Sequence, residues 1–299
     1  MTPQELKNSI LQLAIQGKLV EQRPEEGTAE ELFAQIQAEK QRLIAEKKIK
    51  KEKPLSEIAE DEKPFDIPES WKWVRLGNIG RTNIGLTYNP KDISENGTIV
   101  LRASNIQHER MDYSDTVRVG SDIPENKMCH KGDILICARN GSKRLVGKAA
   151  LIDQEGMSFG AFMAIFKSCC NEFLIHVINS AYFRNSLLGD TSTTTINQIT
   201  HNMLKGFAVP LPPLAEQKRI VAKIEELLPY IDRYEAAWSK LEQFNARFPE
   251  DMKKSLLQYA IQGKLVEQRP EEGTAEELFQ IIQKHHEGLK PCKDELDFS

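Results

Sequence analysis

The sequence contains one stretch of twenty residues twice. AIQGKLVEQRPEEGTAEELF occupies residues 14–33 and recurs letter for letter at residues 260–279. Because caps, turns and apolar spacing are written in the local sequence, the two copies are expected to form the same local structure. The repeat therefore predicts a middle region flanked by two equivalent arms.

Both arms carry helix signals. At the amino end, Thr2 can cap a helix, Pro3 fits its first turn, Glu5 can reach back to the cap, and Gly17 is a natural stop. Inside the repeat, a turn marked by Pro24 and Gly27 precedes a second capping box that opens another helix. Its residue pairs are Thr28 with Glu31 in the first copy and Thr274 with Glu277 in the second.

Composition limits the remaining choices. A chain of 299 residues that is 40% hydrophobic can bury one substantial core with helical extensions. No apolar run approaches the roughly 20 residues of a membrane helix, and the amino end lacks a secretory pattern, so no membrane contact and a cytoplasmic location are expected. The five cysteines are odd in number and form no CxxC pair, which favours reduced thiols over disulfides or zinc.

Charge is unevenly distributed. The chain has a net charge of −4, but residues 65–210 hold 16 Lys plus Arg against 14 Asp plus Glu, a net charge of +2. A mildly basic middle between acidic arms is compatible with a DNA-reading core and equally with an ordinary solvated surface.

A long helix is predicted over residues 214–247, where apolar residues alternate spacings of four and three as in a coiled-coil seam. At about 1.5 Å per residue it would span roughly 50 Å, more than one turn of DNA. Pro229 predicts a bend and Pro249 the exit. Ordinary core packing in a helical bundle is the alternative explanation for these regularly spaced apolar residues. The predicted interface residues are Ile220, Ile224, Leu227, Ile231, Tyr234, Trp238 and Leu241.

The segment before the middle region, residues 51–64, changes from lysine-rich to acidic and contains prolines. This composition favours a solvated linker. The middle itself, residues 65–212, has short β-rich runs separated by Gly and Asn turns, which predicts a compact α/β domain.

Two polar segments of the middle region are candidate DNA contacts. Residues 132–152 read as a hairpin turning at Asn140-Gly141, and a basic hairpin tip fits a DNA groove. A hydroxyl-rich run follows at residues 191–195, and Ser, Thr and Asn can hold phosphates while paired amides can read adenine. Solvated charges on an ordinary turn and helix capping are the rival interpretations. The candidates are Arg139, Asn140, Ser142, Lys143, Arg144, Thr193, Thr194, Thr195, Asn197 and Gln198.

Catalytic signals are weak. GSKRLVGKA has five residues between its glycines where a phosphate-binding loop needs four, and NPKD at residues 89–92 matches only the first two residues of an Asn-Pro-Pro-aromatic motif. No nucleophile or nucleotide-binding turn stands out, so no catalytic residue, metal or cofactor is assigned.

Three segments resemble the DNA specificity subunits of Type I restriction-modification systems. IPESWKWVRLGNI is similar to the family's entry into a target recognition domain, and GDILICARNGSKRLVGKAALI to its central hairpin. TTTINQITHNMLKGFAVPLPPLAEQKRIVAKI is similar to its exit into a long helix, and PLPPLAEQxRIV is the most specific of these signals.

The resemblance implies an α+β protein in which one recognition domain is flanked by helices forming an antiparallel coiled-coil spacer. It implies a non-catalytic subunit that binds double-stranded DNA, holds methyltransferase subunits, and lets motor-nuclease subunits join. Adenine N6 methylation with S-adenosylmethionine would belong to the methyltransferase partners. The expected parts are a helical region at 1–50, a linker at 51–64, the recognition domain at 65–212, the spacer helix at 213–248 and a helical repeat at 249–299.

The chain departs from the family in having one recognition domain where typical members have two. A half subunit would need a second copy, paired along the apolar seam, to read a two-part palindromic site. A truncated fragment of a two-domain protein, a self-sufficient methyltransferase or nuclease, and a structural coiled-coil adaptor remain the alternatives.

Overall fold

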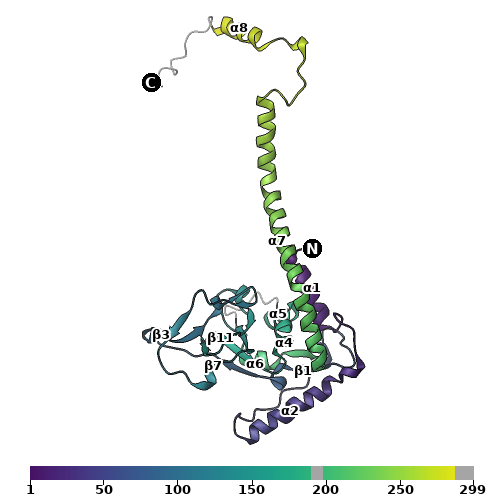
Figure 1. The fold of residues 1–299 in the computed structure, drawn as a ribbon, viewed down its shortest axis with the longest axis vertical. Helices are drawn as coiled ribbons and strands as arrows, with labels where there is room; N and C mark the ends of the chain where they lie inside the picture. The colour runs from purple at the N-terminus through teal and green to yellow at the C-terminus, as the bar shows by residue number, and fades with distance from the viewer. Residues whose placement is uncertain (190–197, 287–299) are drawn as a thin grey trace. The chain divides into compact units, whose positions relative to one another are not determined.

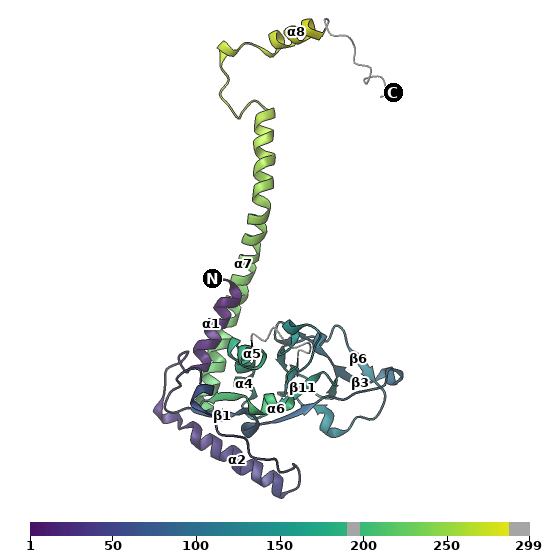
Figure 2. The ribbon, with the colours of Figure 1, turned by 180° about the vertical axis from the view of Figure 1, so that it is seen from behind.

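The computed structural model describes residues 1–189 and 198–286. The chain divides into two compact units, Met1–Glu235 and Ala236–Ser299, and the division falls inside helix α7, Leu214–Ile261. Figures 1 and 2 show the ribbon from opposite sides. Within the described residues, no helix combines the length and apolarity needed to cross a membrane.

The amino-terminal arm folds as its caps predict. Helix α1 (Pro3–Ile15) begins with a complete capping box between Thr2 and Glu5, and helix α2 (Ala29–Ala45) begins with one between Thr28 and Glu31. Between them Gly17 has a φ of 69°, a left-handed conformation that favours glycine over other residues. These predictions are confirmed.

The middle of the chain is an α/β structure, as predicted. One sheet is antiparallel in the order β2-β11-β8-β9, and a second, in the order β6-β3-β10-β7, contains a parallel β3–β10 pair. Strands β1 and β12, and β4 and β5, form two-stranded ladders. The strands are β1 (Lys72–Arg75), β2 (Arg81–Ile84), β3 (Ile93–Leu101), β4 (Ile106–Gln107), β5 (Arg110–Met111), β6 (Val117–Val119), β7 (Met128–Cys129), β8 (Ile134–Cys137), β9 (Ala149–Leu151), β10 (Met157–Phe159), β11 (Met163–Lys167) and β12 (Ala208–Leu211).

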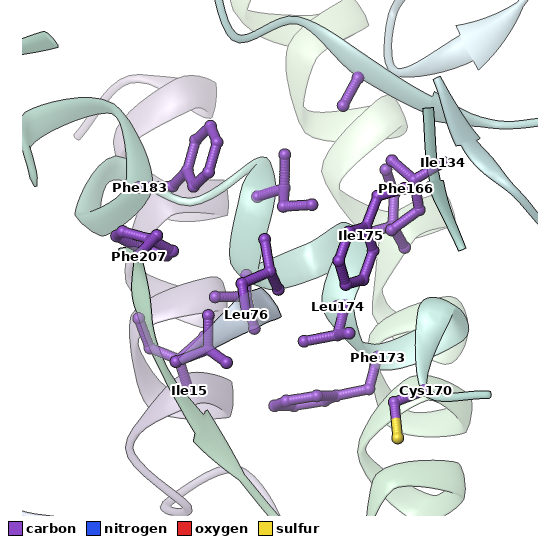
Figure 3. Packing of buried hydrophobic residues seen from close by; sticks show 14 of the residues in the cluster. Ile15, Leu76, Ile134, Phe166, Cys170, Phe173, Leu174, Ile175, Phe183 and Phe207 are labelled. Atoms are coloured by element: carbon purple, nitrogen blue, oxygen red, sulfur yellow. The ribbon is translucent and has the colours of Figure 1, made fainter. Parts of the chain in front are cut away.

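Short helices complete this part of unit 1. They are α3 (Leu76–Ile79), α4 (Asn171–Ile178), α5 (Ala181–Leu188) and α6 (His201–Gly206). A core cluster joins them to the arm, because Ile15 of α1, Phe173 of α4 and Ile134 of β8 belong to one set of buried side chains. Figure 3 shows several members of this cluster from close by. The amino-terminal helices are thus packed on the α/β structure and share its core.

The predicted solvated linker at residues 51–64 is held against the domain. The buried Arg75 guanidinium donates to both carboxylate oxygens of Glu62, at 2.6 and 2.8 Å, and to the backbone carbonyls of Ser56 and Glu57. Lys205 adds an ion pair to Glu52 at 2.6 Å. No residue from 51 to 64 is buried and most are exposed, so the segment is solvated while these few contacts anchor it to the domain.

Helix α7 is longer than predicted. It runs without interruption for 48 residues through both Pro229 and Pro249, so the expected exit at Pro249 was wrong. A proline removes one backbone donor but leaves the hydrogen bonds on either side intact, so a long helix can continue past it at a cost of about 3 kcal/mol. The helix ends at Ile261, two residues before Gly263, whose φ is 65°.

The first half of the predicted seam is occupied within the chain. Ile220, Ile224 and Ile231 are 0%, 2% and 5% exposed, so their assignment to contacts between chains is corrected to packing within one chain. Figures 1 and 2 both show α1 alongside this part of α7. The Tyr234 hydroxyl donates to the Met1 carbonyl at 2.6 Å, while Gln22 meets Glu216 near the start of α7, so the pair is antiparallel.

The second copy of the repeat reproduces the local structure of the first. Thr274 and Glu277 form the same reciprocal cap before α8 (Ala275–His286), and Gly273 has a φ of 78° where Gly27 has 80°. Burial differs, because every residue of the second copy is exposed whereas Ile15 and Ala29 of the first copy are fully buried. Identical sequence therefore gives identical caps and turns in two very different environments.

Candidate nucleic-acid interface

The loop between β8 and β9 is the most basic connection in the sheet. The two strands form the predicted hairpin, with Ile134 opposite Leu151. The predicted two-residue turn at Asn140-Gly141 was wrong, because such a turn needs a positive φ at both positions and neither residue has one. The chain instead makes a wider loop over residues 138–148, closed where the Gly147 N–H donates to the Cys137 carbonyl at 2.9 Å.

This loop is fixed by backbone hydrogen bonds at its base. The N–H groups of Ala138 and Arg139 both donate to the Phe162 carbonyl, at 2.9 and 3.0 Å. On the other side, the Ile199 N–H donates to the Ala138 carbonyl at 2.8 Å, and Arg139 pairs with Gln198 as an isolated antiparallel bridge. The fold thereby brings together the two segments that the sequence marked separately as candidate DNA contacts.

Positive charge gathers on this loop. No Asp or Glu occurs from residue 134 to residue 152, whereas Arg139, Lys143, Arg144 and Lys148 all lie there. The first three are exposed, and the Lys143 ammonium donates to the Gly189 carbonyl at 3.1 Å. A run of cations without a carboxylate suits contact with phosphate oxygens.

The polar residues of the loop have separate roles. The Asn140 carboxamide oxygen accepts from the Ser142 N–H at 2.9 Å, which shapes the turn. Ser142 is exposed beside it. Both residues remain candidate DNA contacts.

Phe162 is a surface aromatic that the sequence analysis missed. Its side chain is 59% exposed, and the Arg139 guanidinium lies 5.4 Å from its ring centre. The surrounding sequence, SFGAFMAIF, reads as a continuous apolar strand, so no local signal separates this outward ring from the buried ones. Aromatic rings and arginine side by side can contact both base faces and phosphates.

A small cavity opens beside Phe162. It has a volume of about 190 Å³ and is lined by side chains from β2, β8, the Phe162 loop and the start of α6. One lining residue, His201, has its Nδ1 atom 2.5 Å from the hydroxyl of Thr82 on β2. The lining includes Ile84, Arg139, Phe162, Gln198 and His201.

The surroundings of His201 favour its neutral form. Burial lowers the pKa of the imidazole, and the nearby Lys205 ammonium lowers it further. A neutral imidazole retains one acceptor and one donor nitrogen, which allows it to pair with the Thr82 hydroxyl in either direction. The cavity wall is therefore polar but uncharged at this position.

The remaining candidates have mixed outcomes. Thr193, Thr194, Thr195 and Asn197 lie outside the described residues, whereas Gln198 is part of the bridge to Arg139. Nearby Thr200 caps α6 by accepting from the Met203 N–H at 3.2 Å, so the capping interpretation holds at that position. On α7, Leu227 is half-buried and Leu241 is 51% exposed, which leaves their role between chains a prediction.

Known proteins show similarity over this same region. Residues 68–237 match the family described as the Type I restriction modification DNA specificity domain. The Type I restriction enzyme EcoAI specificity subunit of Escherichia coli is 34% identical over 232 residues, which cover 75% of this chain and 39% of that protein. The EcoKI specificity subunit of E. coli strain K12 is 30% identical over 210 residues, covering 67% of this chain and 44% of the relative.

The fold is also similar to a solved structure. A chain from a study of complex assembly and conformational transition of the type I R-M system aligns with a TM-score of 0.52 at 21% identity. The alignment covers 79% of this chain and 58% of the other, and this similarity concerns the fold alone. The chain spans less than half the length of the two curated relatives. Since the family match covers more than half of the present sequence, the chain belongs to the Type I restriction-modification DNA specificity family.

Proposed function

We propose that this chain reads one part of a DNA target for a Type I restriction-modification complex. The observation that carries the proposal is the bridge between Arg139 and Gln198, which unites the basic loop with the polar segment before α6. The surface so formed offers cations for phosphates, a carboxamide for base edges and the exposed Phe162 ring for apolar contact. Thr193, Thr194, Thr195 and Asn197 belong to this proposal through their position in sequence.

The chain also serves as a scaffold in this proposal. Methyltransferase subunits bind its helices, supply S-adenosylmethionine and methylate adenine at N6, while motor-nuclease subunits join the complete complex. The relatives named above are specificity subunits, which supports a non-catalytic role for this chain. Cytoplasmic action follows from that role, because the target is chromosomal or invading DNA.

A second copy of the chain supplies the second reader. Support comes from the exposed apolar side chains on the later part of α7, a pattern typical of interaction surfaces. Two identical readers related by a two-fold axis would require a palindromic two-part site. The exposed residues include Leu241, Phe244, Phe248, Met252 and Leu256.

Co-expression with the cognate modification subunit, followed by mapping of N6-methylated adenines, tests this function. A two-part palindromic site is the expected result. An asymmetric two-part site would contradict pairing with an identical copy, and retention of scrambled DNA as tightly as genomic targets, at a stated salt concentration, would contradict sequence reading.

A further inference from the structure

The twenty-residue repeat supplies two identical segments, but only one of them is docked. The N-terminal copy, residues 14–33, buries Ile15 and Leu32, which are 0% and 7% exposed. The C-terminal copy, residues 260–279, presents the same side chains as Ile261 and Leu278, which are 87% and 59% exposed. The contacts of the first copy therefore show which surface can bury the side chains equivalent to Ile261 and Leu278.

The surface that receives the N-terminal copy is formed by residues 68–72 and by the first turns of α7. We call it the docking surface and define it by Ser70, Trp71, Lys72, Glu216 and Arg219. The Ser70 carbonyl accepts from the Ala29 N–H at 2.8 Å, and the Ser70 hydroxyl donates to the Gln22 carboxamide oxygen at 3.1 Å. The Gln22 amide in turn donates to Glu216 at 2.5 Å.

Charge and shape match at the same place. The Arg219 guanidinium donates to both carboxylate oxygens of Glu26, at 2.7 and 2.6 Å, and Lys72 forms an ion pair with Glu30. A Cβ atom at Gly17 would lie 2.5 Å from the Pro68 ring, so a side chain cannot be accommodated at that contact. These features specify the docked segment by charge pattern and by backbone approach.

Each of these contacts is made by a residue that the repeat duplicates. Gly17, Gln22, Glu26, Ala29 and Glu30 have identical counterparts in the C-terminal copy, namely Gly263, Gln268, Glu272, Ala275 and Glu276. The local conformation is duplicated as well, since the Gln268 amide donates to the Gly263 carbonyl at 3.1 Å, as the Gln22 amide does to Gly17. The free copy is thus already shaped for the docking surface.

We propose that the C-terminal copy of one chain binds the docking surface of a second copy of this chain, in exchange with that chain's own N-terminal copy. The N-terminal copy has the advantage of being tethered, which gives it a high effective concentration. Exchange is therefore a minor state in the unmodified protein and becomes dominant when the N-terminal copy is weakened. This inference rests on the proposed pairing of two chains and adds a defined contact to it.

Cross-linking between two differently tagged full-length chains tests the exchange. One chain carries Ser70→Cys and the other Ala275→Cys, with a short thiol-to-thiol cross-linker, because the equivalent Ala29 and Ser70 are joined by a backbone hydrogen bond. Each single variant mixed with the unmodified chain gives the background from the native cysteines. A cross-linked pair carrying both tags, above that background, is expected.

The same substitution in the two copies should act in opposite directions. Leu32→Asp on the chain with Cys at position 70 weakens the resident copy and should raise the yield at least tenfold. Leu278→Asp on the chain with Cys at position 275 weakens the incoming copy and should lower the yield by a similar factor. Glu26→Gln and Glu272→Gln form a second matched pair that keeps side-chain size, in case an aspartate at position 32 impairs folding.

The exchange is refuted if the yield of the cross-linked product carrying both tags stays at background when the receiving chain carries Leu32→Asp or Glu26→Gln. Sedimentation equilibrium on the same samples distinguishes a failure of the exchange alone from a failure of chain pairing as a whole. Dimers without the adduct would contradict the exchange but leave pairing intact, whereas monomers at every concentration would contradict both.

Discussion

Arg139 and Gln198 face each other as antiparallel bridge partners, and the Arg139 guanidinium lies over the ring of Phe162. The bridge joins the two backbones, and the exposed Arg139 side chain lies against the aromatic ring. Neither segment has this arrangement by itself, because the loop after β8 and the segment before α6 each supply one partner. The proposed reading surface therefore depends on the whole domain being folded.

Replacing Arg139 by alanine should weaken binding to the mapped target by about 1–3 kcal/mol if the guanidinium contacts a base, with relaxed preference at one position. A phosphate contact would instead weaken all sequences alike and lower the salt slope by about one. Fluorescence anisotropy at several salt concentrations distinguishes the two. Lys131→Ala, at the opposite end of the same hairpin, is the control and should change little.

Phe162→Ala should reduce affinity for DNA by about 1–3 kcal/mol, because stacking or apolar contact with bases is lost. Since the ring is 59% exposed, the free energy of unfolding should change by only about 0.5 kcal/mol. Phe162→Leu keeps apolar area but not the ring. Equal affinity of both variants and the parent chain, in the same anisotropy assay, would remove Phe162 from the reading surface.

Arg75→Ala should lower the free energy of unfolding by about 2–4 kcal/mol, because the linker carbonyls and Glu62 lose their shared partner. Arg75→Lys should recover only part of the lost free energy of unfolding, since an ammonium cannot make the paired contacts of a guanidinium. Urea denaturation measures both. Arg42→Ala removes ion pairs at a side chain that is 60% exposed, and it should cost less than about 1 kcal/mol.

The acid sensitivity of folding should depend on His176. Burial lowers the pKa of this imidazole to about 4, and the Lys7 ammonium acts in the same direction. The unfolded chain, with a histidine pKa near 6.5, then binds a proton that the folded chain excludes. Stability from this group is complete above about pH 6.5 and falls as the pH drops towards 4, by up to about 3 kcal/mol.

His176→Gln should flatten that part of the stability profile. Urea denaturation at half-unit steps from pH 4 to pH 7 provides the measurement. The slope of the variant is compared with that of the parent chain, because carboxylates also titrate near the acid end of this range and burial raises the pKa of the Glu216 carboxyl. An unchanged slope between pH 4 and 6.5 in the variant would show that His176 titrates normally in the folded chain.

Equivalent positions of the repeat should respond unequally to mutation. Ile15→Ala should destabilise the chain by about 2–5 kcal/mol, because it leaves a cavity in the core. Ile261→Ala, at an 87% exposed side chain, should change stability by less than about 0.5 kcal/mol at low protein concentration. Thermal unfolding of the two variants side by side checks this. Similar losses would mean that the second copy is docked in solution.

Several sequence predictions rested on local chemistry and held for that reason. The capping boxes at Thr2 and Thr28 need only residues three positions apart, and the β8–β9 hairpin needs only two apolar runs close in sequence. Two local predictions failed, the turn at Asn140-Gly141 and the helix exit at Pro249, and one that concerned partners far along the chain failed as well. Ile220 and Ile224 looked available until α1 covered them, whereas residues 51–64 stay mostly exposed and are only anchored through Arg75.

The repeat separates these two levels. The sequence by itself determined where each copy stops its first helix, turns and caps the next, because backbone φ preferences and reciprocal cap hydrogen bonds involve neighbouring residues alone. Only the tertiary structure decided that Ile15 is buried and Ile261 exposed, because burial requires a complementary surface, and the shared core of unit 1 provides it for one copy. The spacing of apolar side chains shows which face of a helix is apolar, and tertiary packing decides whether another element covers that face.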